Sequence, residues 1–144
     1  IANIFNNGME YFNSFGGNPV SCSIGNAVLD VLKNDNLQKN AKKTGNYFIR
    51  CLNKIRLKYP KYISEIRGRG LFLGIDFIDN KNNKPNRKIA DFVINIMREK
   101  GILLSTDGPY KNVIKIKPPM TFNKQNVDTV CDELENILKK LSIY

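Results

Sequence analysis

The sequence of 144 residues predicts an α+β fold, in which helices cover a small, mostly antiparallel sheet. Two observations carry this prediction. Apolar residues recur every three or four positions in four separate stretches, as is typical of amphipathic helices. Between these stretches, residues 71–78 alternate with a period of two, and short apolar runs follow at 102–105 and 113–117, as is typical of strands. The elements therefore follow the order α-α-β-β-α-β-β-α.

The first two helices are defined by their end signals. We expect the first over residues 19–32, because Asn18 is a favourable N-cap residue and a proline suits the first helical position. The second is longer and begins at Leu37, and Pro60 ends it. Its apolar stripe includes Phe48, which we assign to the core rather than to a ligand site.

The remaining elements alternate between strands and helices. We expect a strand pair within 63–78, followed by a helix over 88–100 that ends at Gly101. Two strands follow, over 102–105 and 113–117, with a turn at 106–109 between them. The last helix begins after the N-cap Asn123. In the last strand, Lys115 and Lys117 share one face and the isoleucines share the other, because side chains alternate along a strand.

Composition limits the possible functions. The sequence has no histidine and three widely spaced cysteines, so we expect no Ser-His or Cys-His nucleophile, no metal site and a reducing, cytoplasmic location. No apolar run reaches the length of a membrane span. The net charge of +10 would also suit a nucleic-acid partner. However, the basic residues are scattered and are not interleaved with aromatic ones, so we expect a solvated surface and no nucleic-acid partner.

One glycine-rich segment immediately precedes the first complete helix. It reads Ser14-Phe15-Gly16-Gly17-Asn18-Pro19. Such a turn leaves backbone N–H groups at the positive end of the helix dipole, which favours phosphate or carboxylate there. Ser14 would add a hydroxyl donor to the same anion. The residues alone favour the simpler alternative, a plain helix entry in which the glycines only allow a tight turn.

Two further segments carry basic residues beside glycines or prolines. The first, Ile66 to Asp76, contains Arg67 and Arg69 between glycines, and these arginines could grip an anion or pair with acids along a strand edge. The second runs from Ser105 to Pro109 and resumes around Lys115. This lysine could bind a substrate, or it could face solvent on an edge strand.

These three segments, which span nearly the whole chain in the right order, resemble the C-terminal region of class III (fold type I) pyridoxal-phosphate aminotransferases. The resemblance implies that Ser14, where the family usually has threonine, reaches the cofactor phosphate of a neighbouring subunit. It implies a chiefly structural role for the glycine block, with Arg67 as a candidate substrate-binding residue.

The family typically has an arginine where Lys115 stands, and that arginine binds the substrate α-carboxylate. Lysine at this position, together with the Ser105–Pro109 wording, is most similar to the phospho-lyase branch, which includes the ethanolamine-phosphate and phosphohydroxylysine phospho-lyases. The resemblance therefore implies either transamination or elimination from a phosphorylated amine.

The same resemblance implies how the chain is organised. Residues 1–17 would be an incomplete lead-in from a large domain, and residues 18–144 the small C-terminal domain. In the family, the Schiff-base lysine lies in that large domain, so we expect pyridoxal phosphate in the complete enzyme but no covalent attachment and no activity in this chain alone. The expected partners are the large domain or an upstream polypeptide and a second copy in a homo-oligomer. The alternative is a non-catalytic orphan or split-gene domain that only folds and dimerises.

Overall fold

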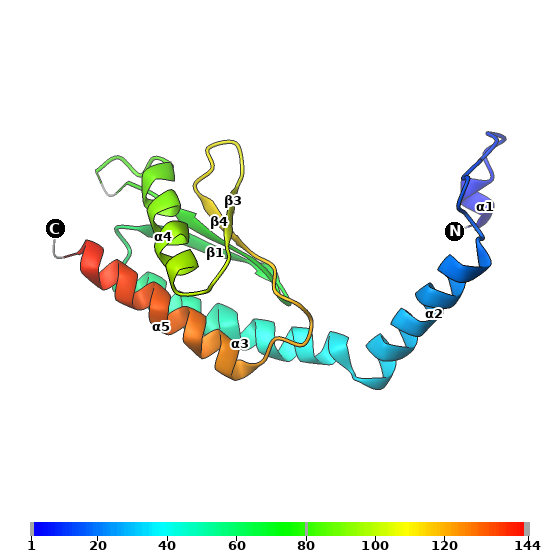
Figure 1. Ribbon diagram of the computed structural model, residues 1–144. Coiled ribbons are helices and arrows are strands. Elements are labelled where there is room, and N and C mark those ends of the chain that lie inside the picture. Colours follow the sequence, from blue (N-terminus) through cyan, green and yellow to red (C-terminus); the bar gives the residue numbers. More distant parts are fainter. Residues whose placement is uncertain (1, 80, 143–144) are drawn as a thin grey trace. The chain divides into compact units, whose positions relative to one another are not determined.

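The computed structural model describes residues 2–79 and 81–142 and divides the chain into two compact units between Asn36 and Leu37 (Figure 1). The first unit holds α1 (Ala2–Phe5) and α2 (Pro19–Asn34). The predicted start of α2 is confirmed, because the side-chain oxygen of Asn18 accepts hydrogen bonds from the N–H groups of Val20 and Ser21, each at 3.1 Å. Within the described residues, α2 buries none of its side chains.

The second unit is a four-stranded antiparallel sheet with helices on one side (Figure 1). The strand order across the sheet is β1-β2-β4-β3. The strands are β1 (Ile63–Arg69), β2 (Phe72–Phe77), β3 (Ser105–Asp107) and β4 (Val113–Ile116), and the helices are α3 (Leu37–Lys58), α4 (Arg87–Glu99) and α5 (Lys124–Leu141). The predicted α+β class and the order of the elements are confirmed.

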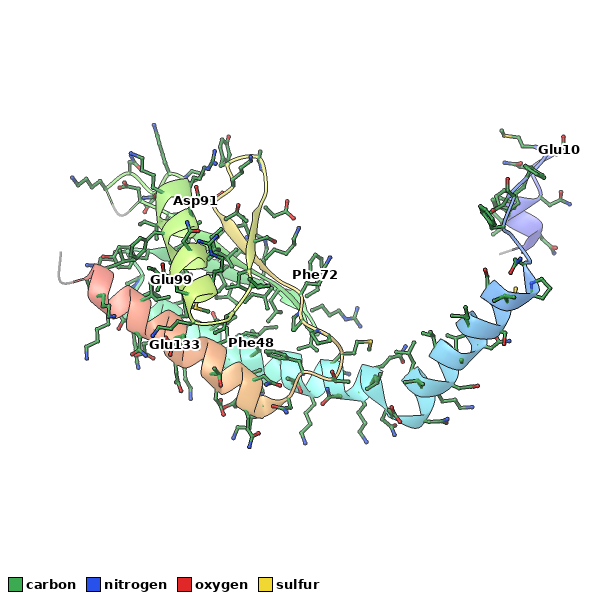
Figure 2. All side chains as sticks on the ribbon, viewed as in Figure 1. Glu10, Phe48, Phe72, Asp91, Glu99 and Glu133 are labelled. Carbon is green, nitrogen blue, oxygen red and sulfur yellow. The ribbon has the colours of Figure 1, made fainter. Side chains whose placement is uncertain are left out.

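The core lies between the sheet and the three helices. Every second residue of β2 and β4 is buried there, as period-two alternation requires: Leu73, Ile75, Phe77, Ile114 and Ile116. The helices contribute residues at three- and four-residue spacing, and Phe48 of α3, labelled in Figure 2, is fully buried among them. The assignment of Phe48 to the core is therefore confirmed.

Local signals set the helix ends in this unit. Asn123 caps α5 in a reciprocal capping box, with its side chain and that of Asn126 each accepting the other's backbone N–H. Asn86 caps α4 through a single hydrogen bond, in which its side-chain oxygen accepts the Ile89 N–H. Gly101 follows α4 with a φ of +77°, a left-handed conformation that glycine adopts without strain.

One expectation about the strands is wrong, and one alternative that the sequence left open does not hold. The strand expected at 102–105 is displaced, because β3 covers Ser105–Asp107. Thr106 and Asp107, which their composition had assigned to a turn, are part of this strand. The turn begins at Gly108. Pairing of Thr106 with Ile114 across the sheet overrides the local turn signal. In addition, β4 is not an edge strand, because it lies between β2 and β3.

Candidate anion-binding site

The uncovered face of the sheet brings together two of the residues singled out in the sequence. Arg67 of β1 pairs with Gly74 of β2, and Gly74 pairs with Lys115 of β4. Directly paired residues of antiparallel strands project from the same face, and adjacent strands are about 4.8 Å apart. Arg67 and Lys115 therefore flank a glycine, in a depression of about 380 Å³ that all three residues line.

Gly74 forms the floor of this depression because it has no side chain. A Cβ atom built there would lie 3.8 Å from Cγ and 4.0 Å from Nε of Arg67, so the arginine side chain lies across the glycine toward β4. The same atom would lie 3.2 Å from Cγ1 of Val113. Any larger residue at position 74 would thus occupy the space between the two basic groups.

Two acidic side chains hold Arg67 at its Nη1 atom. Its Nη1 donates to Glu65 Oε2 at 2.9 Å and also to Asp76 Oδ2. The hydrogen bond that Arg67 donates to Asp76 is the largest cause that raises the pKa of Arg67, and the charges of Asp76 and Glu65 act in the same direction. The sequence-based alternative that the arginines pair with acids along a strand edge is therefore confirmed for Arg67.

Lys115 also has an acidic partner, which the sequence did not single out. Its Nζ donates to Asp107 Oδ2 at 2.7 Å, and the other oxygen of Asp107 accepts the N–H of Gly108 at 2.8 Å. These two hydrogen bonds, that of Lys115 first, lower the pKa of Asp107. The apparent turn composition around Asp107 hid this role, because only the pairing of β3 with β4 brings it beside Lys115.

Ser14 lies in the first unit, in a loop whose backbone donors are largely taken. Asn13 Oδ1 accepts the N–H groups of Phe15 and Gly16, each at 3.1 Å. The N-cap Asn18 takes two more N–H groups at the start of α2, so the expectation that these would point outward to an anion is wrong. Ser14 is exposed, and its hydroxyl has no hydrogen bond within the described residues, so this hydroxyl is the donor that suits a phosphate.

Metal and membrane sites are not evident in what the structure describes. Over residues 2–79 and 81–142, no three Cys, Asp or Glu side chains converge as metal ligands. Among the helices of the same ranges, none combines the length and the apolar character needed to cross a bilayer.

The uncovered sheet face of this α+β unit thus has two basic side chains beside a glycine, which makes it a candidate anion-binding site. Comparison with known proteins identifies its family. A model described as aminotransferase class III matches residues 1–138, and the chain belongs to that family. Membership implies pyridoxal phosphate as the cofactor of the complete enzyme.

Two relatives show how far the similarity extends. The alanine–glyoxylate aminotransferase 2-like protein of Drosophila melanogaster is 45% identical over 123 residues, which are 84% of this chain and 25% of that protein. The ethanolamine-phosphate phospho-lyase homolog 1 of Caenorhabditis elegans is 38% identical over 140 residues, which are 96% of this chain and 30% of that protein. The chain thus spans between a quarter and a third of the length of these relatives.

Solved structures agree with the fold. A phospholyase from Arthrobacter in complex with phosphoethanolamine matches 96% of this chain and 33% of its own, with a TM-score of 0.87 and 35% identity. An acetylornithine aminotransferase from Elizabethkingia anophelis matches 92% of this chain and 33% of its own, with a TM-score of 0.77 and 26% identity.

Proposed function

We propose that this chain is the C-terminal part of a pyridoxal-phosphate enzyme that eliminates phosphate and ammonia from a phosphorylated amine. The observation that carries the proposal is that Lys115, and not an arginine, faces Arg67 across Gly74. Two relatives named above are phospho-lyases by name, and one of them was solved with phosphoethanolamine. Residues 1–17 would lead in from a large domain, and residues 18–144 would form the small domain.

The chemistry of the two basic groups favours a phosphate over a carboxylate. A carboxylate is planar and matches the fork of an arginine, whereas the lysine ammonium is a point charge without that geometry. A phosphate monoester has three oxygens and carries up to two negative charges, so it can accept from Arg67 and Lys115 together. Asp107 offsets part of the charge of Lys115, and an entering dianion competes for the ammonium better than a monoanion does.

Ser14 would act at a different group. Its hydroxyl would donate to the cofactor phosphate of a neighbouring subunit, which makes the active enzyme a homo-oligomer. When bound, pyridoxal phosphate supplies an electron sink for the bond-breaking steps. The residues of this chain would hold the two phosphates, one on the cofactor and one on the substrate. Cys22, Cys51 and Cys131 are free thiols, in keeping with the cytoplasm as the proposed compartment.

Transamination is the second candidate for the same site. The Drosophila relative is an aminotransferase by name at 45% identity, and the Elizabethkingia structure is an acetylornithine aminotransferase. In that reaction Lys115 and Arg67 would hold a substrate carboxylate. The third candidate is a non-catalytic orphan or split-gene domain, for which the exposed α2 would serve only in association.

The products separate these candidates. The complete polypeptide that carries this sequence, loaded with pyridoxal phosphate, is incubated with phosphoethanolamine, and inorganic phosphate and acetaldehyde are measured. A parallel reaction contains alanine and glyoxylate, and glycine is measured. We expect stoichiometric phosphate and aldehyde in the first reaction. Glycine formation without phosphate release would favour transamination, and neither product from a cofactor-loaded protein would favour the orphan domain.

A further inference from the structure

We infer that Asp76 is a positioning residue for Arg67, and that Asn112 in turn holds Asp76 in place. The inference rests on the proposed role of Arg67 in anion binding and adds how the arginine is made ready for it. Asp76 lies on β2, on the uncovered face, and its side chain is 18% exposed. Neither Asp76 nor Asn112 stands out in the sequence.

The two oxygens of Asp76 have different partners. Oδ2 accepts from Arg67 Nη1, toward the surface, and Oδ1 accepts from Asn112 Nδ2 at 3.1 Å, toward the interior. Asn112 is 5% exposed and is itself anchored to the backbone of Phe77. The side-chain Nδ2 of Asn112 donates to the backbone carbonyl of Phe77 at 3.0 Å, and the backbone carbonyl of Asn112 accepts the Phe77 N–H at 3.0 Å. Asn112 therefore fixes the orientation of the Asp76 carboxylate relative to the end of β2, whether or not Arg67 is bound to it.

This arrangement decides which edge of the guanidinium is free. The two hydrogens of Nη1 serve Glu65 and Asp76, whereas Nε–H and the Nη2 group have no acceptor among the residues that the structure describes. Those two nitrogens form the side edge of the guanidinium, which can bind two oxygens of one anion in parallel. Nε lies near the floor of the depression, 4.0 Å from a Cβ atom built on Gly74.

Arg67, with this free edge, and Lys115 both line the depression at Gly74. An anion above Gly74 would accept two hydrogen bonds from Arg67 and one from the ammonium of Lys115. A long arginine on an edge strand would otherwise lose rotamer freedom on binding, which weakens affinity. Holding the Nη1 end with Asp76 removes much of that loss before the anion arrives.

A double-mutant cycle in the complete, cofactor-loaded protein tests the inference. The variants are Asp76→Asn, Arg67→Gln and the double variant, and the readouts are KM and kcat for phosphoethanolamine. Asparagine at position 76 keeps the shape, but it must turn its NH2 group toward either Asn112 or Arg67, where it meets another donor. We expect Asp76→Asn to raise KM about tenfold, as for one lost charge-assisted hydrogen bond, and to leave kcat within about twofold. The double variant should be no worse than Arg67→Gln alone, because Asp76 acts through Arg67.

The chain offers a matched control pair. Asp91 accepts from Arg87 Nε at 3.0 Å on α4, the helix that covers the other face of the sheet, and Figure 2 labels it. Asp91→Asn removes an acid from an Arg–Asp pair in the same way, so it should leave KM unchanged. Asp76→Glu retains the charge and should recover part of the loss.

A second readout does not depend on turnover. Inorganic phosphate is titrated into the cofactor-loaded protein by calorimetry, with the thermal midpoint of each variant measured alongside. We expect Asp76→Asn to weaken phosphate binding about tenfold and Asp91→Asn to leave it unchanged. If Asp76→Asn does not fold, Asp76→Glu and Asn112→Ala take its place, and each should weaken phosphate binding less than Arg67→Gln does.

The outcomes separate the two proposals. Arg67→Gln with unchanged KM and unchanged phosphate binding would contradict the role of Arg67 in the proposed function itself. If Arg67→Gln raises KM and weakens phosphate binding but Asp76→Asn changes neither, only the positioning role of Asp76 is overturned. The same conclusion follows if the losses of the two single variants add in the double variant. Absence of phosphate binding to the parent protein would overturn both.

Discussion

Gly45 of α3 lies against the backbone of Gly70, so closely that a methyl group added to Gly45 would overlap the Gly70 carbonyl group. Gly70 begins the two-residue connection between β1 and β2 and has a φ of +58°. The close approach lets α3 pack directly on the end of the hairpin that carries Arg67 and Gly74. Two glycines from distant parts of the sequence thus position the site without taking part in it.

We therefore expect Gly45→Ala to lower the free energy of unfolding by about 3 kcal/mol, because backbone must move to relieve the overlap. Gly25→Ala is the matched control, since Gly25 also lies within a helix, α2, and a Cβ there meets nothing within 4 Å. Alanine at Gly25 should stabilise its helix by up to about 1 kcal/mol. Urea unfolding followed by circular dichroism measures both. Equal effects of the two substitutions would contradict the packing argument.

The capping box of α5 gives a second prediction. Asn123→Ala removes the side-chain oxygen that accepts the Asn126 N–H at 3.0 Å. The loss of an N-cap should cost about 1 kcal/mol of stability. Asn136→Ala, at an exposed position within the same helix, should cost nothing. A smaller loss for Asn123 than for Asn136 would show that the capping box does not hold the helix start.

Tyr47 gives a prediction for alkaline pH. Its hydroxyl donates to Asp128 Oδ1 at 2.5 Å, and this bond is the largest cause that raises the pKa of Tyr47 above its ordinary value of 10.0. The folded state then keeps a proton that the unfolded state releases, so stability falls as the pH rises above 10. Below pH 10 the contribution is fully present.

Thermal midpoints of the parent protein and of Tyr47→Phe, taken from pH 8 to pH 11, measure this contribution. We expect the advantage of the parent over Tyr47→Phe to shrink as the pH passes 10. Tyr110→Phe, which removes an exposed hydroxyl, is the matched control variant. A constant difference between parent and Tyr47→Phe would mean that the proton on Tyr47 is not linked to folding.

Lys115 and Lys117 form a matched pair for the substrate role. Both lie on the same side of β4 and its extension, but only Lys115 lines the depression at Gly74. We expect Lys115→Met to lower kcat/KM for phosphoethanolamine at least about tenfold in the complete enzyme, because one charged hydrogen bond to the substrate is lost. Lys117→Met should stay within about twofold. Similar losses in both would point to the general positive field instead of a specific contact.

Much of the fold could be predicted from local signals. Asn18 and Asn123 mark helix starts that the structure confirms, and the alternation after residue 70 marks β2. The exception is β3, where Asp107 and Gly108 have turn composition but the pairing with β4 extends the strand to Asp107. Local propensity cannot report a partner that lies elsewhere in the sequence.

The site was predictable only as separate residues. Arg67 and Lys115 stood out because each is a basic residue in a distinctive segment, but their alignment across Gly74 depends on the strand order and register. Asp76, Asp107 and Asn112 are ordinary polar residues in the sequence, and only the antiparallel pairing makes them partners. The role of Ser14 stays a prediction, since it depends on a group that a second subunit would hold.

The strand order also has a consequence for how the site assembles during folding. Arg67 and Gly74 belong to a hairpin with a two-residue connection, and such local contacts form quickly. Lys115 joins them only after α4 and the following loop have been closed into the sheet, which carries a larger entropic barrier. We therefore expect Arg67 and Gly74 to reach their native arrangement early in folding and Lys115 to join them late. A nascent chain that ends before β4 would then carry Arg67 and Gly74 on a formed hairpin but would lack Lys115.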